Sequence, residues 1–449
     1  MPSTSRPTPR RLPTSGAAGH APISGCPDVS RNRNRECVPE VFVGVRQRFL
    51  RRRTDSPKLP LAPVGPVLLG AFAVAIAVAA GVFYAGWHLL HAHGLQPQHR
   101  LSSDTLFDLV KLAFGVVAGS GALVALVVAF RKQIVDEDGA LREATRLHTE
   151  RFTAAVSQLG DTSAAVRLGG VHALAGLADD APSRDLRQTC IEVLCAYLRL
   201  PYTAEADLPA GDPALRQDFL ANREVRHTVI RLIRDHLRLD TDARRSWSGH
   251  DLDFTGVVFD GGDFDEARFA GGTVSFESAR FTAGLVSFIG AEFTGGRVSF
   301  TLAQFAGSRV TFSLARFAGG KVIFGSTQFA EGKVDFNGAA FTGGTVAFGD
   351  AAFTGGAVSF DQAEFDGSTI DFNGAQFAGS TIDFDGAQFI GGTVSFGRAV
   401  FGGGAVSFDR ALFGGGTVSF DSVSGARPAG LPSSSPGPLP SGLVLASGW

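Results

Sequence analysis

Residues 336–360 read FNGAAFTGGTVAFGDAAFTGGAVSF, and this pattern decides the fold of the C-terminal half. Phe recurs at alternating steps of five and seven residues, so each 12-residue unit contains two Phe. The same alternating spacing continues without interruption from Phe269 to Phe420. Before it, successive Phe residues are five positions apart, at Phe254, Phe259, Phe264 and Phe269. A self-similar period of this kind predicts a solenoid, in which stacked units bury what no single unit can bury.

Each unit pairs its Phe with a smaller residue two positions earlier. Ala occupies one of these positions from Ala279 to Ala411, with Thr327 as the exception, and Val or Ile occupies the other. Residues two apart lie on the same side of an extended strand, so both members of each pair are expected to point inward. The four-residue connectors, typically A/T-G-G-T/K, contain Gly that permits positive φ angles.

The unit length leaves two possible coil sizes. A coil of one unit would have to enclose two Phe, one Val and one Ala without disulfide bracing. We therefore predict a four-sided coil made of two units, about 24 residues in length. At about 4.8 Å between stacked strands, about seven to eight coils would form a rod about 35 Å long. Phe341 is expected to point into the core of that rod.

These residues resemble the pentapeptide-repeat family, whose motif places Ala or a small residue two before a central Phe or Leu. The resemblance is close over Asp251–Phe269 and has two extra residues on alternate sides over Phe269–Val423. It implies a right-handed four-sided β-helix over 247–423, and the layout of the chain resembles membrane-attached pentapeptide-repeat proteins of high-GC bacteria. Some proteins with this repeat imitate duplex DNA and occupy DNA gyrase.

Two apolar segments predict a membrane anchor over 61–132. Leu61–Leu90 contains no Asp, Glu, Lys or Arg, and Val67–Leu90 would give about 36 Å of helix, enough for a bilayer core of about 30 Å. Leu112–Phe130 is a second uncharged segment, in which Gly115, Gly119 and Gly121 predict close packing against the first helix. A cleaved signal peptide would have a shorter apolar core nearer the start of the chain.

Basic residues predict the orientation of the two helices. Six basic residues precede the first helix, four follow the second, and the link between the helices has only Arg100. The excess of Lys and Arg predicts a multi-pass cell-membrane protein with both termini in the cytoplasm. Lys111 is expected to extend its side chain to the membrane edge. The flanking residues are Arg46, Arg48, Arg51, Arg52, Arg53 and Lys58 before, and Arg131, Lys132, Arg142 and Arg146 after.

Between the anchor and the solenoid, residues 133–246 predict a small α-helical domain. Apolar residues recur at spacings of three and four, and the pattern gives helices over 136–159, 162–179, 184–199 and 213–239. Cys190 and Cys195 lie on one of these helices and point about 140° apart, so they are expected to fill the core rather than form a disulfide.

The two ends of the chain have the composition of disordered segments. Residues 1–60 are rich in Pro, Ser and Arg, and Cys26 and Cys37 lie there without His or Cys at metal-ligand spacing; this stretch is either a disordered arm or partly an over-extended reading frame. Residues 424–449 are rich in Pro, Ser and Gly and are expected to form a disordered tail. Charge is segregated, because 1–60 holds 12 basic and 4 acidic residues whereas 251–423 holds 9 and 19.

No set of residues predicts catalytic, cofactor-binding or metal-binding chemistry, and a small-molecule ligand is not expected. Residues 251–423 contain no His, Cys or Tyr, and the phosphate-binding loop, zinc-ligand pair and nucleophile elbow are absent from the sequence. His91, His93 and His99 lie in the short link without a carboxylate or Cys to complete a metal site. Asp335, Asp371, Asp383 and Asp385 are expected to form an outward, solvated ladder.

The favoured function is a non-enzymatic, membrane-anchored scaffold that presents the cytoplasmic solenoid to an unidentified protein partner. The alternative is imitation of DNA to bind a topoisomerase or another nucleic-acid-binding protein, without direct contact to nucleic acid. The acidic balance of the solenoid is compatible with that alternative, but Arg297, Arg309, Lys321 and Lys333 dilute it on one side. Ice binding through outward Thr-x-Ser pairs is not favoured, because the same basic residues interrupt the Thr series.

Overall fold

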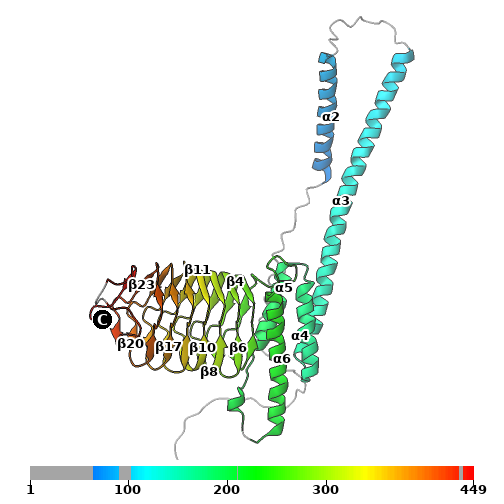
Figure 1. The fold of residues 1–449 in the computed structure, drawn as a ribbon. Coiled ribbons are helices and arrows are strands. Elements are labelled where there is room, and N and C mark those ends of the chain that lie inside the picture. Colours follow the sequence, from blue (N-terminus) through cyan, green and yellow to red (C-terminus); the bar gives the residue numbers. More distant parts are fainter. Residues whose placement is uncertain (1–63, 90–102, 210, 434–437) are drawn as a thin grey trace, which may run out of the picture.

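The computed structural model describes residues 64–89, 103–209, 211–433 and 438–449. One long helix, α3, rises from a helical region, α2 lies beside its far half, and the solenoid extends sideways from that region (Figure 1). The predictions for 1–60, including Cys26 and Cys37, and for the link His91, His93 and His99 lie outside the described residues.

Helix α2 spans Val64–Leu89 and helix α3 spans Ser103–Leu159. Among the described residues, only α3 is long and apolar enough to cross a membrane, by length and composition, whereas the apolar part of α2 is the shorter Phe72–Ala85. The side chains of Leu112, Phe114 and Phe130 are 64–71% exposed, as expected of a surface that no other part of this chain covers. The structure therefore supports one of the two predicted membrane-spanning helices.

Helix α3 differs from the sequence prediction in two respects. It continues without a break through the predicted domain boundary at 132/133, so the second apolar segment and the first helix of the helical domain form one rod of 57 residues. A Cβ added at Gly115, Gly119 or Gly121 would meet no heavy atom within 4 Å, so the predicted close approach of the two apolar helices is absent there.

Three further helices pack at the base of α3. Helix α4 spans Ala164–Asp179, α5 spans Arg184–Leu198 and α6 spans Pro213–Leu237, with the short 3-10 helix η1 at Glu205–Asp207 between the last two. Ser183 caps α5 by accepting a hydrogen bond from the backbone N–H of Leu186, and Asp212 caps α6. The predicted helices over 162–179, 184–199 and 213–239 agree closely with these bounds.

The solenoid consists of two parallel sheets whose strands stack coil upon coil. Among the described residues, sheet A comprises β1 (Leu252–Asp253), β4 (Arg268–Ser275), β7 (Glu292–Ser299), β9 (Arg316–Ile323), β11 (Ala340–Ala347), β14 (Glu364–Phe365), β15 (Thr369–Asp371), β18 (Gln388–Phe389), β19 (Thr393–Ser395), β22 (Leu412–Phe413), β23 (Thr417–Ser419) and β25 (Leu443–Val444).

Sheet B forms the opposite wall of the solenoid. It comprises β2 (Val258–Phe259), β3 (Gly262–Asp263), β5 (Arg280–Phe281), β6 (Leu285–Ser287), β8 (Gln304–Thr311), β10 (Gln328–Asp335), β12 (Ala352–Phe353), β13 (Ala357–Ser359), β16 (Gln376–Phe377), β17 (Thr381–Asp383), β20 (Val400–Phe401), β21 (Ala405–Ser407) and β24 (Ser424–Gly425) among the described residues. Successive 12-residue units therefore alternate between the two walls.

The strand register gives the coil size. Phe293 pairs with Phe317 and Arg297 with Lys321 across adjacent strands of sheet A, an offset of two repeat units. The prediction of two units per coil is therefore confirmed, and the solenoid has about eight turns. The first coil is shorter, because Phe259 pairs with Phe281.

The core is formed by four columns of stacked Phe rings. Phe341 is fully buried and lies between Phe317 and Phe365, with ring centroids 4.7 and 4.9 Å away and ring planes nearly parallel. Rings of neighbouring columns meet edge to face, as Phe336 and Phe348 do at 5.9 Å. Stacked and edge-to-face geometries are both favourable for aromatic pairs, so the inward orientation predicted for Phe341 is correct.

Two kinds of connector close each coil. The Gly-containing connectors lie inside one wall as β-bulges in the proximal strands, where the register between β9 and β11 shifts around Gly343. The tight corners are instead the two-residue connectors after Val-x-Phe, in which the second residue has a positive φ at every unit. Ten of these corner residues, such as Leu314 at φ 58°, are not Gly, a feature the sequence pattern did not predict.

Both ends of the solenoid are covered by other parts of the chain. Helices α5 and α6 pack against β1 and β3 at the N-terminal end, and the apolar core is continuous across that contact. At the other end, β25 pairs with β23, and Trp449 packs against Phe401 and Phe420 at 5.6 Å from each ring. The described part of 424–449 is therefore an ordered cap, in contrast to the predicted disordered tail.

Candidate interaction surface

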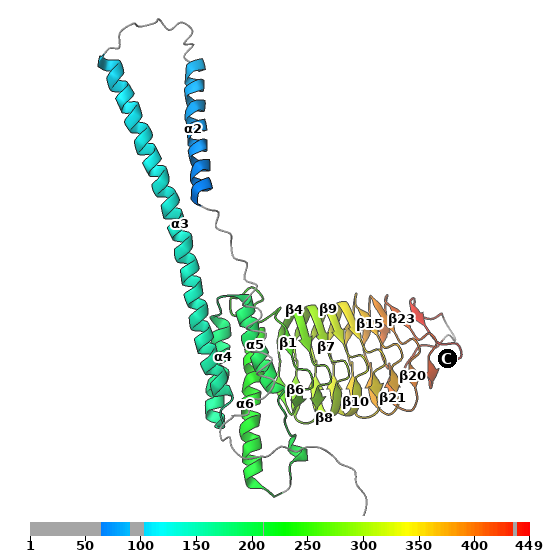
Figure 2. The same cartoon turned by 180° about the vertical axis from the view of Figure 1, so that it is seen from behind.

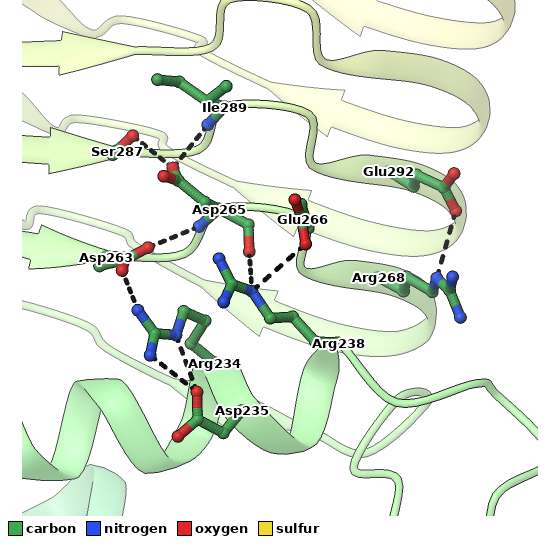
Figure 3. A network of polar contacts seen from close by, with 10 residues as sticks. All are labelled: Arg234, Asp235, Arg238, Asp263, Asp265, Glu266, Arg268, Ser287, Ile289 and Glu292. Atoms are coloured by element: carbon green, nitrogen blue, oxygen red, sulfur yellow. Dashed lines mark hydrogen bonds and ion pairs between the residues drawn. The ribbon is translucent and has the colours of Figure 1, made fainter.

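A polar network joins helix α6 to the first coils of the solenoid (Figure 3). Arg234 contacts Asp263 of β3 and lies 2.8 Å from Asp235. Arg238, which follows α6, donates a hydrogen bond of 2.6 Å from its Nε to the backbone carbonyl of Asp265. Within the solenoid, Arg268 Nε of β4 lies 3.6 Å from the carboxylate of Glu292 of β7. These contacts fix the direction of the solenoid relative to the helices.

Asp260 is the centre of a second, more buried cluster at the same junction. Its carboxylate accepts a hydrogen bond from the Tyr202 hydroxyl at 2.7 Å and lies 3.1 Å from His227 Nε2 and 3.0 Å from Arg223 Nε. Burial opposes ionisation of Asp260, but the hydrogen bonds from His227 and Tyr202 and the charge of Arg223 outweigh it and lower the pKa of this carboxyl. The cluster holds α6 and the η1 segment against the solenoid.

The cysteines of the helical region are buried and lack the environment of a reactive thiol. Cys190 and Cys195 are free and fully buried, which raises the pKa of each thiol to about 12. The Cys190 sulfur lies 3.8 Å from His148 Nε2, whose pKa burial lowers. The prediction that both cysteines fill the core is confirmed, because both are free, fully buried and packed in the apolar core.

Two further sequence predictions concern charged groups. Within the part of the chain that the structure describes, no group of three or more His, Cys, Asp or Glu side chains is arranged to hold a metal ion. Lys111 is exposed on α3 and pairs with Asp108 at 3.1 Å.

The predicted ladder of outward carboxylates is not uniform. Asp371 lies on sheet A, Asp383 on sheet B and Asp385 in the following corner, and all three are half-buried. Burial, followed by the neighbouring Asp385 and Asp361 charges, raises the pKa of Asp383. Asp335 is buried, in contrast to its predicted solvated position, as are Thr311 and Ser359 at the same repeat position of sheet B. Two cations of sheet B also contact its carboxylate.

The four basic residues predicted on one side lie on opposite walls. Arg297 stacks next to Lys321 on sheet A, and Arg309 stacks next to Lys333 on sheet B. Sequence reasoning missed this division, although the two-unit period contains the signal: residues two units apart share a wall, and residues one unit apart do not. The walls therefore present different charge patterns, and the side walls are the surface on which a macromolecule can bind.

Comparison with known proteins supports the assignment of the repeat. Residues 254–304 match the family model of pentapeptide repeats (9 copies). No curated protein and no solved structure matches the chain. The matched residues cover the first coils, including the start where Phe recurs every five residues, and the same four Phe columns continue beyond them to Phe420.

Proposed function

We propose that this chain, whose C-terminal half is a pentapeptide-repeat β-solenoid, is a non-enzymatic scaffold that presents the side walls of the solenoid to a protein partner at a membrane. Solenoids of this family are generally structural or interaction proteins. The observation that carries the proposal is the covering of both solenoid ends, by α5 and α6 at one end and by the C-terminal cap at the other. The walls are then the extensive surface left for a partner.

The rigidity of the scaffold supports the same proposal. The Phe columns and the continuous helix α3 join the walls to the apolar segment Leu112–Phe130 through the packed helices α4, α5 and α6. A partner bound to the solenoid would therefore be held at a defined place relative to the bilayer. We propose that two apolar helices anchor the chain in the cell membrane with both termini in the cytoplasm.

Imitation of DNA is less well supported by the charge distribution. Residues 268–333 carry seven basic and three acidic residues, whereas 335–421 carry two and ten. A DNA-like surface requires a continuous row of negative charge, and the proximal half of the solenoid interrupts it. Inhibition of DNA supercoiling by a topoisomerase at micromolar concentrations of this protein would favour imitation of DNA over the scaffold.

Affinity capture from solubilised membranes tests the proposal. The full chain and a chain lacking 247–425 serve as baits, and we expect a specific set of partners only with the full chain. Two sets of wall substitutions, both confined to strand positions that point away from the core, then identify the binding wall. They are Gln304→Arg with Gln328→Arg and Gln376→Arg on sheet B, and Ala340→Arg with Glu364→Arg and Gln388→Arg on sheet A.

Two outcomes would contradict the proposal. Equal capture by both baits would show that the solenoid does not recruit the partner. Recovery of the full chain in the soluble fraction after carbonate extraction of membranes would show that the apolar helices do not anchor it. Loss of capture with one wall set and retention with the other is the expected result.

A further inference from the structure

Equivalent strand positions of the two walls carry stacked cations, but only on sheet B does a carboxylate contact them. On sheet B, Arg309 and Lys333 both contact Asp335, at 3.3 and 2.8 Å, and Asp335 is almost completely buried beneath them. On sheet A, the residue that takes the place of Asp335 after Lys321 and Val322 is the apolar Ile323. The stacked pair Arg297 and Lys321 therefore lies on a wall without the matching carboxylate.

A third cation extends this feature. Arg316 begins the same strand as Lys321 and pairs in register with Glu292, but Glu292 is the residue that Arg268 approaches at 3.6 Å. Arg297, Arg316 and Lys321 are all exposed, and we call them the sheet A cation cluster. Like charges stacked on neighbouring strands repel one another, so an anionic surface placed against the cluster would be attracted to it.

The orientation of sheet A identifies what lies opposite the cluster. In two views from opposite sides, the strands labelled β4, β9, β11, β15 and β23 form the wall on the side toward which α2 and α3 rise (Figures 1 and 2). Sheet B, with β6, β8 and β10, faces the other way. The long axis of the solenoid runs across α3, so a membrane crossed by the apolar part of α3 would lie over sheet A.

The distal half of the same wall has the opposite charge. Glu364, Asp366 and Asp371 follow the cluster along sheet A, and no basic residue accompanies them on that wall between 340 and 396. Electrostatic attraction to an anionic surface acts over about 8 Å at physiological ionic strength, so each half of the wall would respond by itself. The proximal coils, which are nearest to α3, are the ones attracted.

We propose that the sheet A cation cluster binds the anionic headgroups of the bilayer that holds α3, so that the proximal half of the solenoid docks on the membrane surface. This inference rests on the proposed membrane anchor. Eighteen residues of α3, about 27 Å of helix, separate Phe130 from His148 at the helical base. This distance exceeds the screening length of about 8 Å, so docking requires α3 to tilt toward the side of the solenoid. Sheet B then remains exposed to the cytoplasm for the protein partner.

The lysine content of the chain provides the test. The solenoid contains only two lysines, Lys321 on sheet A and Lys333 on sheet B. The full chain is placed in lipid nanodiscs of phosphatidylcholine alone or with added phosphatidylglycerol, and the rate of acetylation by an amine-reactive reagent is measured at each lysine by mass spectrometry. We expect Lys321 to react roughly fivefold more slowly in the anionic discs, with Lys333 unchanged.

Matched variants separate the cluster from the overall charge. Arg297→Gln with Arg316→Gln keeps Lys321 as the probe and should restore its reactivity in anionic discs. Arg398→Gln with Arg410→Gln removes the same charge from distal corners and should leave the protection of Lys321 intact. All four side chains lie outside the Phe core, so unchanged thermal melts are expected for both variants.

The outcomes distinguish this inference from the proposed function. Equal reactivity of Lys321 in neutral and anionic discs, with the protein still inserted, would overturn headgroup binding and leave the anchor in place. Protection that is equal in both lipids and persists in Arg297→Gln with Arg316→Gln would likewise overturn it. Failure of the chain to co-purify with any disc would instead contradict the anchor on which the inference rests.

Discussion

At the scale of single residues, equivalent positions of successive repeat units have nearly the same surroundings, and small differences in those surroundings determine how much a substitution changes stability. Phe341 occupies one of many equivalent core positions, and Gly344 and Gly290 both have positive φ but differ in how closely another backbone approaches them. Because the positions recur in every unit, each substitution has an internal control elsewhere in the chain. Two predictions use this property.

Truncation of Phe341 to Ala should lower the free energy of unfolding by about 3–5 kcal/mol, because it leaves a cavity between two stacked rings. Urea denaturation of the detergent-solubilised chain measures the loss. Leu412→Ala is the control, since Leu412 is 61% exposed and its truncation should change stability by less than about 0.5 kcal/mol. A loss below about 1 kcal/mol for Phe341→Ala would contradict its position in the core.

Replacement of Gly344 by Ala should destabilise the solenoid by at least about 2 kcal/mol more than replacement of Gly290. Gly344 has φ 69°, and an added Cβ would lie 2.6 Å from the backbone oxygen of Gly320. At Gly290, with φ 65°, the nearest atom is the flexible Glu266 side chain at 3.8 Å. Urea denaturation of the two variants tests the difference, and equal stabilities would refute the close approach.

At the scale of elements, the parts that were predicted correctly are those with a strong period. The Phe and Val positions determine where the strands lie, which side chains point inward and how many residues form a coil. This follows because a core built of stacked coils tolerates only one strand register. Asp335 shows the limit of that reasoning. Its repeat position on sheet B is buried at Ser287 and Thr311 as well. Only the stacking of successive coils reveals that Arg309 and Lys333 both contact its carboxylate. The charge clusters therefore required the three-dimensional register.

Two other elements could not be read from composition. The polar stretch Asp136–Gly139 marks a helix boundary by propensity, yet α3 continues through it, with side-chain pairs such as Gln133–Glu137 at 3.0 Å on its surface. The Pro-rich tail hides the apolar residues Leu431, Leu443 and Trp449, whose contacts with the last coil are long-range. Local sequence signals do not contain such contacts.

Removal of 426–449 should expose the last coil and cause end-to-end association. The edge of β23 loses its partner β25, and the Phe401 and Phe420 rings lose Trp449. Unpaired strand edges favour pairing with another chain. Analytical ultracentrifugation in detergent should show dimers or larger species for the truncated chain.

The control for the truncation is Trp449→Ala, which removes the ring but keeps the β23–β25 pairing. This variant should remain monomeric and melt at a slightly lower temperature. If the truncated chain is monomeric and melts at the same temperature as the full chain, the cap does not protect the solenoid end.

At the scale of the whole molecule, the junction of helices and solenoid determines where the walls lie relative to helix α3. Its contacts include a buried histidine as well as the Asp260 cluster. His250 lies 3.0 Å from Gln188 of α5 through its Nδ1, and Gln188 also bonds to the backbone of Asp251. The junction should therefore respond to pH.

Acidification should loosen the contact between α5 and the first coil. Burial, with the charges of Arg184 and Arg187, lowers the pKa of His250 from 6.5 to about 4. Because the unfolded state binds the proton more readily, the stabilisation is complete above pH 6.5 and declines as pH falls toward 4. The protection factors of residues 247–252 against hydrogen exchange, each corrected for the intrinsic exchange rate at its pH, measure this opening in the full chain.

A His250→Gln variant should make the protection factors of 247–252, which are exchange rates corrected for the intrinsic pH dependence of amide exchange, nearly independent of pH in that range. A local measurement is needed because burial also lowers the pKa of His148 on α3. Protonation of His148 would lower the melting temperature of the whole chain in the same pH range. Asp260 affects stability in a separate pH range. Because its pKa is lowered from 3.8, the stability that its ionised carboxylate contributes is lost only as the pH falls below 3.8. Unchanged protection factors between pH 7 and 4 in the unmodified chain would contradict the prediction.

The alternation of units between two walls constrains how the gene can change in length. Loss or duplication of two adjacent units removes or adds a full coil, and every residue beyond the change keeps its wall. Loss or duplication of one unit would preserve the spacing of the Phe residues and the core, but it would transfer the outward side chains of all later units to the opposite wall. Slippage of the repetitive DNA by a single unit would therefore yield a well-folded protein whose inward-facing surface is intact and whose outer recognition pattern is reversed.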